Sequence, residues 1–171
     1  QKVDTAIAIF LILIGILLLV LPLFNITNLK YLSIGIFALY TILNLIQFVL
    51  TRKSKDYEGL HSAIGSLIIL IASIILNPEE SPKTLAMLLM TWIIFMSLAK
   101  LKKMDYYHDK KDRMWKIRFL NLALFIISGI LTCLNLAHSN SIQILIIGFF
   151  MLIHGILELL DPIVKTLIAH S

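Results

Sequence analysis

The chain has 171 residues, of which 59% are hydrophobic and 15% are charged, and its formal net charge is +5. An ordinary soluble domain carries about 25% charged residues, and one of this length has too small an interior to bury so much apolar surface. The composition therefore excludes an ordinary soluble domain and favours an integral membrane protein.

Six apolar segments have the length of membrane spans. A bilayer core about 30 Å thick needs about 20 helical residues, because each residue rises about 1.5 Å. In chain order the predicted spans are residues 5–24, 31–51, 60–76, 84–99, 119–137 and 142–160. The predicted fold class is all-α, a polytopic membrane bundle of six transmembrane helices, in which residues 1–171 form a single transmembrane domain.

The basic residues are distributed unevenly between the two faces of this arrangement. If the six spans alternate in direction, all of the 15 Lys and Arg residues except Lys30 and Lys83 fall on one side. Short loops rich in Lys and Arg stay in the cytoplasm, so both termini are predicted to be cytoplasmic. Because these cations lie at the membrane boundaries, the expected partners are the lipid bilayer and its anionic headgroups, and nucleic acid is not expected.

Short connections at 25–30, 77–83 and 138–141 suggest three tandem helical hairpins, at 5–51, 60–99 and 119–160. The longer basic loop 100–118 is expected on the cytoplasmic side, with parts of it continuing the neighbouring spans as helix. We expect its cations to form a surface for lipid, for a partner protein or for a second copy of the chain. They are Lys100, Lys102, Lys103, Lys110, Lys111, Arg113, Lys116 and Arg118.

A weak internal repeat places glycines at corresponding points of several spans. Spans one, three and five contain Gly-Ile-Leu or Gly-Ser-Leu at 15–17, 65–67 and 129–131, and spans two and six share a glycine-centred step at 33–37 and 146–150. Span four lacks the equivalent glycine. Small residues allow helices to approach closely in lipid. The predicted packing positions are Gly15, Gly35, Gly65, Gly129, Gly148 and Gly155.

These repeats, together with Trp115 leading into the fifth span, resemble the HdeD-like membrane proteins, a short-repeat family of about six spans from bacteria and archaea. The resemblance covers nearly the whole chain. It implies a small protein of a prokaryotic cell membrane, associated in some members with acid resistance, and without an established catalytic site.

Polar side chains gather in the cytoplasmic halves of the spans. His154 and Glu158 are four residues apart and share one helix face, and Pro162 is expected to end that helix. The candidate polar cluster comprises Asn44, Gln47, His61, Asn121, His154, Glu158 and Asp161. One interpretation is an inward-facing vestibule in which His154 and Glu158 exchange a proton. The other is snorkelling to the headgroups and hydrogen bonding between helices.

No nucleophile motif, phosphate-binding loop, metal-ligand pattern or nucleotide fingerprint occurs, so we expect no enzyme activity, cofactor or metal. Trp92 lies in the middle of a span and is expected to serve packing. The leading hypothesis is a non-catalytic membrane protein that acts as a stress-related bundle or as an accessory subunit of a complex. The alternative is a small transporter or channel that uses the polar cluster around His154 and Glu158.

Overall fold

The computed structural model describes residues 2–25, 28–54, 56–137 and 139–169, so parts of the predicted connections 25–30 and 138–141 lie outside the described residues. Over the described ranges the fold is all-helical, without strands. Six helices are long and apolar enough to cross a membrane, which confirms the predicted fold class and indicates an integral membrane protein.

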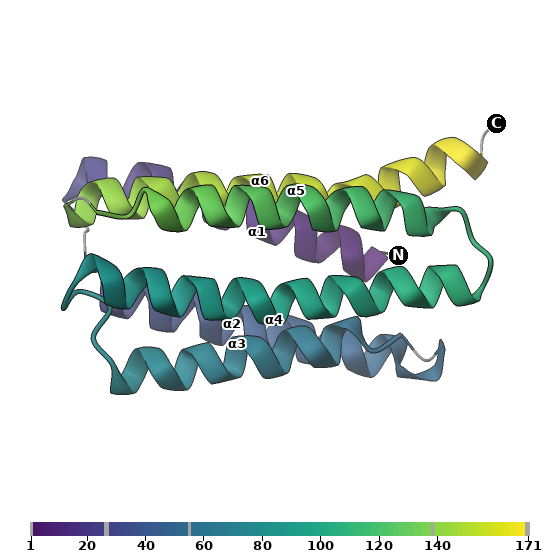
Figure 1. The fold of residues 1–171 in the computed structure, drawn as a ribbon, viewed down its shortest axis with the longest axis horizontal. Coiled ribbons are helices and arrows are strands. Elements are labelled where there is room, and N and C mark those ends of the chain that lie inside the picture. The colour runs from purple at the N-terminus through teal and green to yellow at the C-terminus, as the bar shows by residue number, and fades with distance from the viewer. Residues whose placement is uncertain (1, 26–27, 55, 138, 170–171) are drawn as a thin grey trace.

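The helices run roughly parallel to one axis, as Figure 1 shows. They are α1 (Lys2–Val20), α2 (Leu29–Thr51), α3 (Glu58–Ile75), α4 (Pro82–Asp109), α5 (Met114–Leu134) and α6 (Asn140–Ala169). Two short 3-10 helices, η1 (Leu21–Phe24) and η2 (Arg52–Ser54), follow α1 and α2.

The local sequence determines where two of the helices, α2 and α4, begin. The Asn28 side chain accepts the backbone N–H of Tyr31 at 3.3 Å, and Ser81 accepts that of Thr84 at 3.2 Å. Pro82 then occupies the first turn of α4, where its missing N–H costs nothing.

One connection between helices agrees with the sequence-based expectation and one helix end differs from it. α4 runs on to Asp109 and α5 begins at Met114, so most of the predicted loop 100–118 is helical, as expected in part. Pro162 was expected to end the last helix, and this was wrong, because α6 continues to Ala169. Proline removes its own N–H from the backbone ladder and crowds the carbonyl one turn earlier, which can bend a helix without ending it. Beyond the proline, the hydroxyl of Thr166 donates to the Pro162 carbonyl at 2.8 Å.

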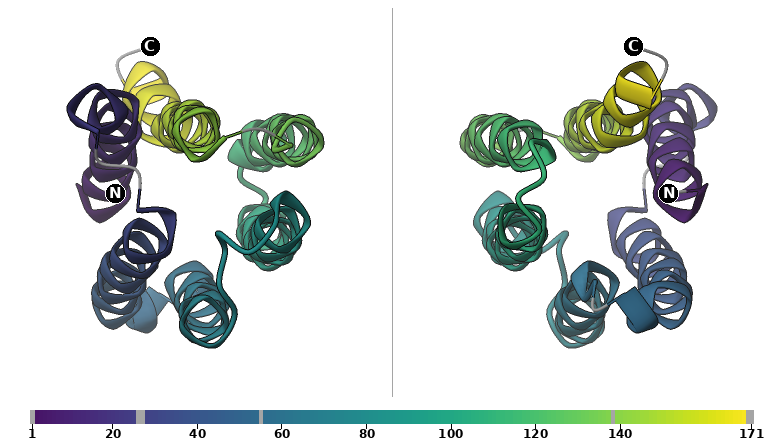
Figure 2. Two further views of the ribbon diagram at one scale, coloured as in Figure 1. Left: turned by 90° about the vertical axis from the view of Figure 1, so that its left-hand side faces the viewer. Right: turned by 90° about the vertical axis from the view of Figure 1, so that its right-hand side faces the viewer.

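Viewed along the bundle axis, the six helices follow one another around a ring (Figure 2). The most extensive packing joins α1 to α6, α2 to α3 and α4 to α5, whereas α1 and α2 touch only slightly. The predicted hairpins 5–51, 60–99 and 119–160 therefore do not describe the closest pairs. One reason is that most of the close glycine contacts lie between α1 and α6, α2 and α3, or α4 and α5, which are not the predicted pairs.

Glycines bring α1 and α6 into backbone contact. A Cβ added at Gly15 would lie 2.7 Å from the Leu152 nitrogen, and one at Gly155 would lie 2.8 Å from the Ile12 nitrogen. Gly148 faces the same interface, where a Cβ would lie 3.1 Å from the Gly15 carbonyl oxygen. Both helices therefore need glycine at these points in order to pack at this distance.

The other glycines differ in their surroundings. Gly65 lies against the Phe95 side chain and Gly129 against Ile93, both on α4. Gly35, which was predicted to make a packing contact, has no neighbouring atom within 4 Å, because this face of α2 points away from the bundle. Gly59, which was not predicted, lies against the backbone of α2, where a Cβ would be 2.7 Å from the Asn44 carbonyl oxygen.

We predict that Gly15→Ala destabilises the protein and that Gly35→Ala does not. The added methyl group at position 15 meets backbone atoms that cannot rotate away, and overpacking of this kind costs about 1–3 kcal/mol. At position 35 the same methyl group enters open space. Thermal unfolding in detergent, followed by the loss of monodisperse protein, checks this; equal midpoints for the two variants would contradict the account of the α1–α6 interface.

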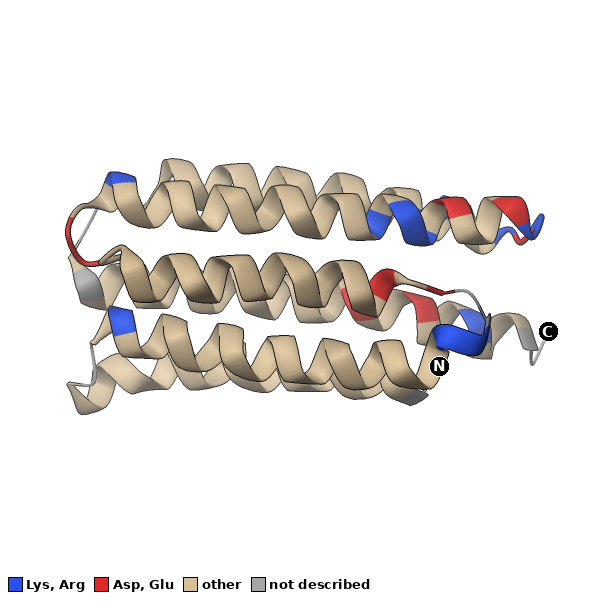
Figure 3. Cartoon of the chain, turned by 90° about the horizontal axis from the view of Figure 1, so that it is seen from below, with Lys and Arg blue, Asp and Glu red and all other residues tan. Residues whose placement is uncertain are grey.

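The two ends of the bundle differ sharply in charge (Figure 3). One end, here called the ionic end, contains the start of α1, the end of α6 and most Lys, Arg, Asp and Glu residues. The other, here called the opposite end, contains few charges, among them Lys30, Glu79 and Lys83. The region between the two ends is nearly free of charged residues.

Candidate functional site

A group of buried ionisable side chains lies inside the bundle toward the ionic end. We call it the ionic cluster; it comprises Asp4, Asp56, Glu58, Lys100, Lys103, Arg118, Glu158 and Asp161. The residues come from α1, α3, α4, α5 and α6 and from the connection that precedes α3. Charged side chains inside a membrane bundle are costly, so such a cluster is a candidate functional site.

Arg118 joins three carboxylates of two helices. Its guanidinium lies 2.9 Å from Glu58 on α3, and 3.2 Å and 3.4 Å from Asp161 and Glu158 on α6. The residue is 1% exposed. Because an arginine keeps its proton in proteins, Arg118 is a permanent positive charge that holds these carboxylates near one another.

Lys100 makes the deepest ion pair of the cluster. Its ammonium group donates to Glu158 and, at 2.9 Å, to the side-chain oxygen of Asn121. It also lies 4.7 Å from the centre of the Phe125 ring, a distance that allows a cation–π interaction. The residue is 0% exposed, so these contacts replace water around its charge.

Lys103 makes the outermost pairs. It donates to Asp56 and lies 3.3 Å from Glu58 and 3.8 Å from Asp4. The Gln47 side chain donates to Asp4 at 2.6 Å and so fixes that carboxylate. Glu58 therefore contacts both Lys103 and Arg118, and the ion pairs form one connected set.

Helical spacing explains why these side chains face inward together. Lys100 and Lys103 are three residues apart on α4, and His154, Glu158 and Asp161 follow one another at intervals of four and three on α6. Residues at such intervals share one face of a helix. The two faces meet at the same height in the ring, where α3 and α5 supply Glu58 and Arg118.

The loop 100–118 was predicted to present a surface for lipid or a partner, and for three of its cations this was wrong. Lys100, Lys103 and Arg118 are buried in the ionic cluster, because carboxylates on facing helices lie at their depth. The remaining five cations are exposed at the ionic end. They are Lys102, Lys110, Lys111, Arg113 and Lys116.

An aromatic cluster closes the ionic cluster toward the middle of the bundle. Trp92 is its centre, and its ring packs edge-on against aromatic rings of α2, α5 and α6 at centroid distances of 5.6 to 6.3 Å. Its other members are Phe37, Tyr40, Phe125, Phe150 and His154. The Trp92 indole N–H donates a hydrogen bond to the hydroxyl of Ser66, 3.3 Å away. Trp92 therefore serves packing, as expected, and it lies buried inside the ring of six helices.

His154 lies between the two clusters. Its Nε2 is 3.4 Å from the Tyr40 hydroxyl, and its ring contacts those of Trp92 and Phe125. Glu158 of the ionic cluster is one helical turn away on the same face of α6. His154 is completely buried, and its Nδ1 has no hydrogen-bond partner in the described part of the chain.

The structure brings together six of the seven predicted polar residues. Asn121, His154, Glu158 and Asp161 belong to or contact the ionic cluster, and Gln47 binds Asp4 as described above. Asn44 is buried beside them and donates to the backbone carbonyl of Tyr40 at 2.7 Å. His61 lies apart, half-buried in a groove at the ionic end.

Three acidic members were missed by sequence reasoning. Asp4, Asp56 and Glu58 lie at the predicted span ends, where acidic residues usually face water. A usable signal existed, since Lys100 and Lys103 share a face and a buried pair of cations requires carboxylates at the same depth. Acidic residues near the start of spans one and three were the candidates for that depth.

Two open grooves connect the ionic cluster with the ionic end. One, of about 490 Å³, lies between the start of α3 and the end of α4 and includes Glu58, His61 and Asp105 in its lining. The other, of about 280 Å³, is lined by Asp4, Lys103 and other polar side chains. Water from this end therefore reaches the outer members of the cluster.

Among the described residues, no group of His, Cys, Asp and Glu is arranged to hold a metal ion. Comparison with models of protein families, with curated proteins and with solved structures finds no match. The chemistry of the site is therefore inferred from the contacts of its own residues.

Proposed function

We propose that the protein is a small transporter or channel that moves protons through the interior of the bundle. The observation that carries this proposal is the connected set of ion pairs that runs from the open groove at Asp4 to Glu158, one helical turn from His154 in the middle of the bundle. Within this set, Lys103 contacts both Asp4 and Glu58. Arg118 then contacts both Glu58 and Glu158.

The cost of this series supports a functional role. A buried ion pair loses its hydration, and apolar residues of similar volume often stabilise a protein as well or better. Here three cations and five carboxylates occupy the interior of a chain that has abundant Leu and Ile for packing. Ionisable residues in such positions mark proton relays in many membrane proteins.

The chemistry of the groups favours a proton over a larger solute. Carboxylates, amines and imidazole accept and release protons, while Arg118 keeps its proton and holds Glu58 and Glu158 close together. The carboxylates exceed the cations by two, so the cluster favours positive charge. The grooves of the described structure end at its outer members, so a larger solute has no open space beyond them.

A structural role is the second candidate, favoured by the ion pairs that join α3, α4, α5 and α6 at one end. In that case the protein acts as a stress-related bundle or as an accessory subunit. The HdeD-like resemblance is compatible with both candidates and carries no catalytic site or cofactor. In either case we propose that the ionic end, with both termini, faces the cytoplasm of a prokaryotic cell, because the Lys and Arg residues concentrate there.

Proton flux into proteoliposomes tests the proposal. A potassium gradient with valinomycin sets the voltage, and an enclosed pH-sensitive dye reports the flux. We expect flux above that of empty vesicles, and at least a tenfold decrease in Glu158→Gln, because an amide at this position cannot accept and release a proton as the carboxylate beside Lys100 can. Glu80→Gln at the opposite end is the matched control, since it makes the same chemical change at an exposed position and should retain wild-type flux.

Absence of flux above empty vesicles, or equal flux in Glu158→Gln and wild type, would contradict a transport role. The structural candidate would then stand, and gentle extraction from the native membrane should recover a stoichiometric partner.

A further inference from the structure

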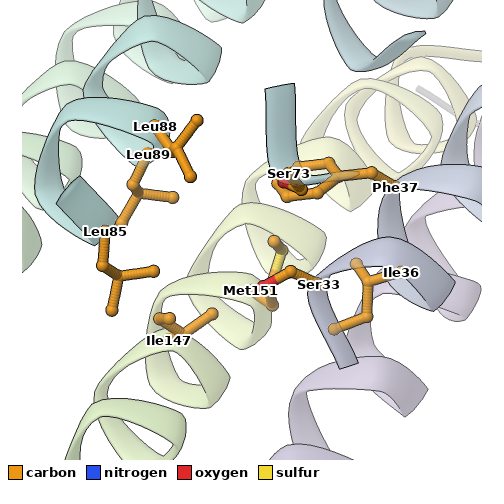
Figure 4. Close-up of a pocket in the computed structure, with 9 residues that line it drawn as sticks. All are labelled: Ser33, Ile36, Phe37, Ser73, Leu85, Leu88, Leu89, Ile147 and Met151. Atoms are coloured by element: carbon orange, nitrogen blue, oxygen red, sulfur yellow. The ribbon is translucent and has the colours of Figure 1, made fainter. Parts of the chain in front are cut away.

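A small cavity lies in the half of the bundle that faces the opposite end (Figure 4). It has a volume of about 30 Å³ and is enclosed by α2, α3, α4 and α6. Its lining is apolar apart from Ser33 on α2 and Ser73 on α3. Its lining residues all belong to those parts of the four helices that are closer to the opposite end than to the ionic end.

Ser73 shows that this cavity is not merely a packing defect. The residue is completely buried, and its hydroxyl has no hydrogen-bond partner in the described part of the chain. Helical Ser and Thr residues usually satisfy the hydroxyl on the carbonyl one turn earlier, as Thr41 and Thr132 do here. A buried hydroxyl without such a bond requires another partner.

A water molecule fits this requirement. The volume exceeds the roughly 10–15 Å³ that one water needs, and Ser33 supplies a second hydroxyl in the lining. A cavity stays dry where its walls are apolar, and here the hydroxyls of Ser73 and Ser33 interrupt an otherwise apolar wall.

The position of the cavity relates it to the proposed pathway. Phe37 lines the cavity and packs on Trp92 at 5.6 Å, and Trp92 packs on His154 at 5.7 Å. Along this line of contacts, Phe37 and Trp92 lie between the cavity and the buried imidazole. The ionic cluster lies beyond His154.

We infer that this cavity is a water-binding chamber, held by Ser73 and Ser33 and reached from the opposite end, that forms the second half of the proton pathway. The aromatic pair Phe37 and Trp92 is then the barrier between the two halves. The role in a pathway rests on the proposed function, whereas hydration from the opposite end does not.

Silver-ion accessibility tests the chamber, because Ag⁺ is small, carries charge and reacts with thiols that contact water. In a Cys133→Ala background, which removes the lone cysteine, Ser73→Cys places a thiol in the chamber. Ile74→Cys is the matched control, since it is the next residue of α3 and is 53% exposed on the outside of the bundle, where lipid covers it. Reaction is measured as protection from later maleimide labelling of the denatured chain.

Sealed right-side-out and inside-out membrane vesicles show from which side the ion arrives. Glu80→Cys and Lys111→Cys mark the opposite end and the ionic end. We expect Ser73→Cys to react with Ag⁺ at least tenfold faster than Ile74→Cys. We also expect this reaction in the same type of vesicle in which Glu80→Cys reacts. Equal rates for positions 73 and 74, or reaction only in the vesicles in which Lys111→Cys reacts, would overturn the inference. If Ser73→Cys does not fold, Ser33→Cys carries the same test.

The two proposals fail separately. Silver reactivity at position 73 without proton flux would leave a hydrated chamber and remove the transport role. Flux that depends on Glu158 without silver reactivity at position 73 or 33 would retain transport and remove the chamber.

Discussion

Arg118→Met should lower the free energy of unfolding by about 3–5 kcal/mol, the cost of removing one partner from a buried ion pair. The substitution leaves Glu58, Glu158 and Asp161, whose side chains are all largely buried, without their shared cation. Three negative charges then repel one another across the α3–α6 space. We expect most of the protein to be lost from the membrane or to aggregate on extraction.

Lys116→Met is the control for Arg118→Met. It removes a positive charge from the same helix two residues away, where the side chain is exposed. Unfolding in a mixed micelle, with a denaturant that is compatible with membrane proteins, measures both variants. If Arg118→Met is as stable as Lys116→Met, the ion pairs of Arg118 do not hold the bundle as described.

Trp92→Ala should have the second large effect, an increase in proton leak of at least tenfold. The Trp92 ring occupies the centre of the aromatic cluster and separates His154 from the chamber beside Phe37. Truncation opens a cavity there, at a cost in stability of about 3–5 kcal/mol. Water entering that cavity would bridge the two halves of the pathway.

Trp115→Ala is the matched control for this leak. It makes the same truncation in a half-buried residue of the ionic end, which packs only on His108 among the rings of the described structure. The flux assay is carried out at a temperature at which both variants remain monodisperse. A folded Trp92→Ala protein that conducts no faster than Trp115→Ala would show that the aromatic cluster is not the barrier.

The six helices could be predicted from the sequence because lipid imposes a single requirement on each span. About 20 apolar residues are needed, and each of the six segments meets that requirement without reference to the others. Which helices pack together depends on pairs of surfaces, and that information is spread over distant positions. Gly15 and Gly148 illustrate this, since each was recognised as a packing residue, but nothing in its own segment indicates that the two face each other across α1 and α6.

The candidate site was predicted in part for a similar reason. His154 and Glu158 stand out because they interrupt an apolar helix, so their importance is visible locally. Lys100 and Lys103 follow the fourth predicted span and Arg118 directly precedes the fifth, so all three look like ordinary boundary cations. Their burial depends on carboxylates contributed by α3 and α6, which no feature of the loop 100–118 reveals.

The central claim is that the ionic cluster moves protons and does more than hold the helices together. The most direct measurement is proton flux through the double variant Lys100→Met, Glu158→Gln in proteoliposomes. Removing both partners leaves no unpaired charge between them, and such paired replacements often preserve stability. Arg118 keeps Glu58 and Asp161, so the fold is expected to survive. The account predicts a monodisperse protein with near wild-type stability and flux no higher than that of empty vesicles; a stable double variant with wild-type flux would contradict it.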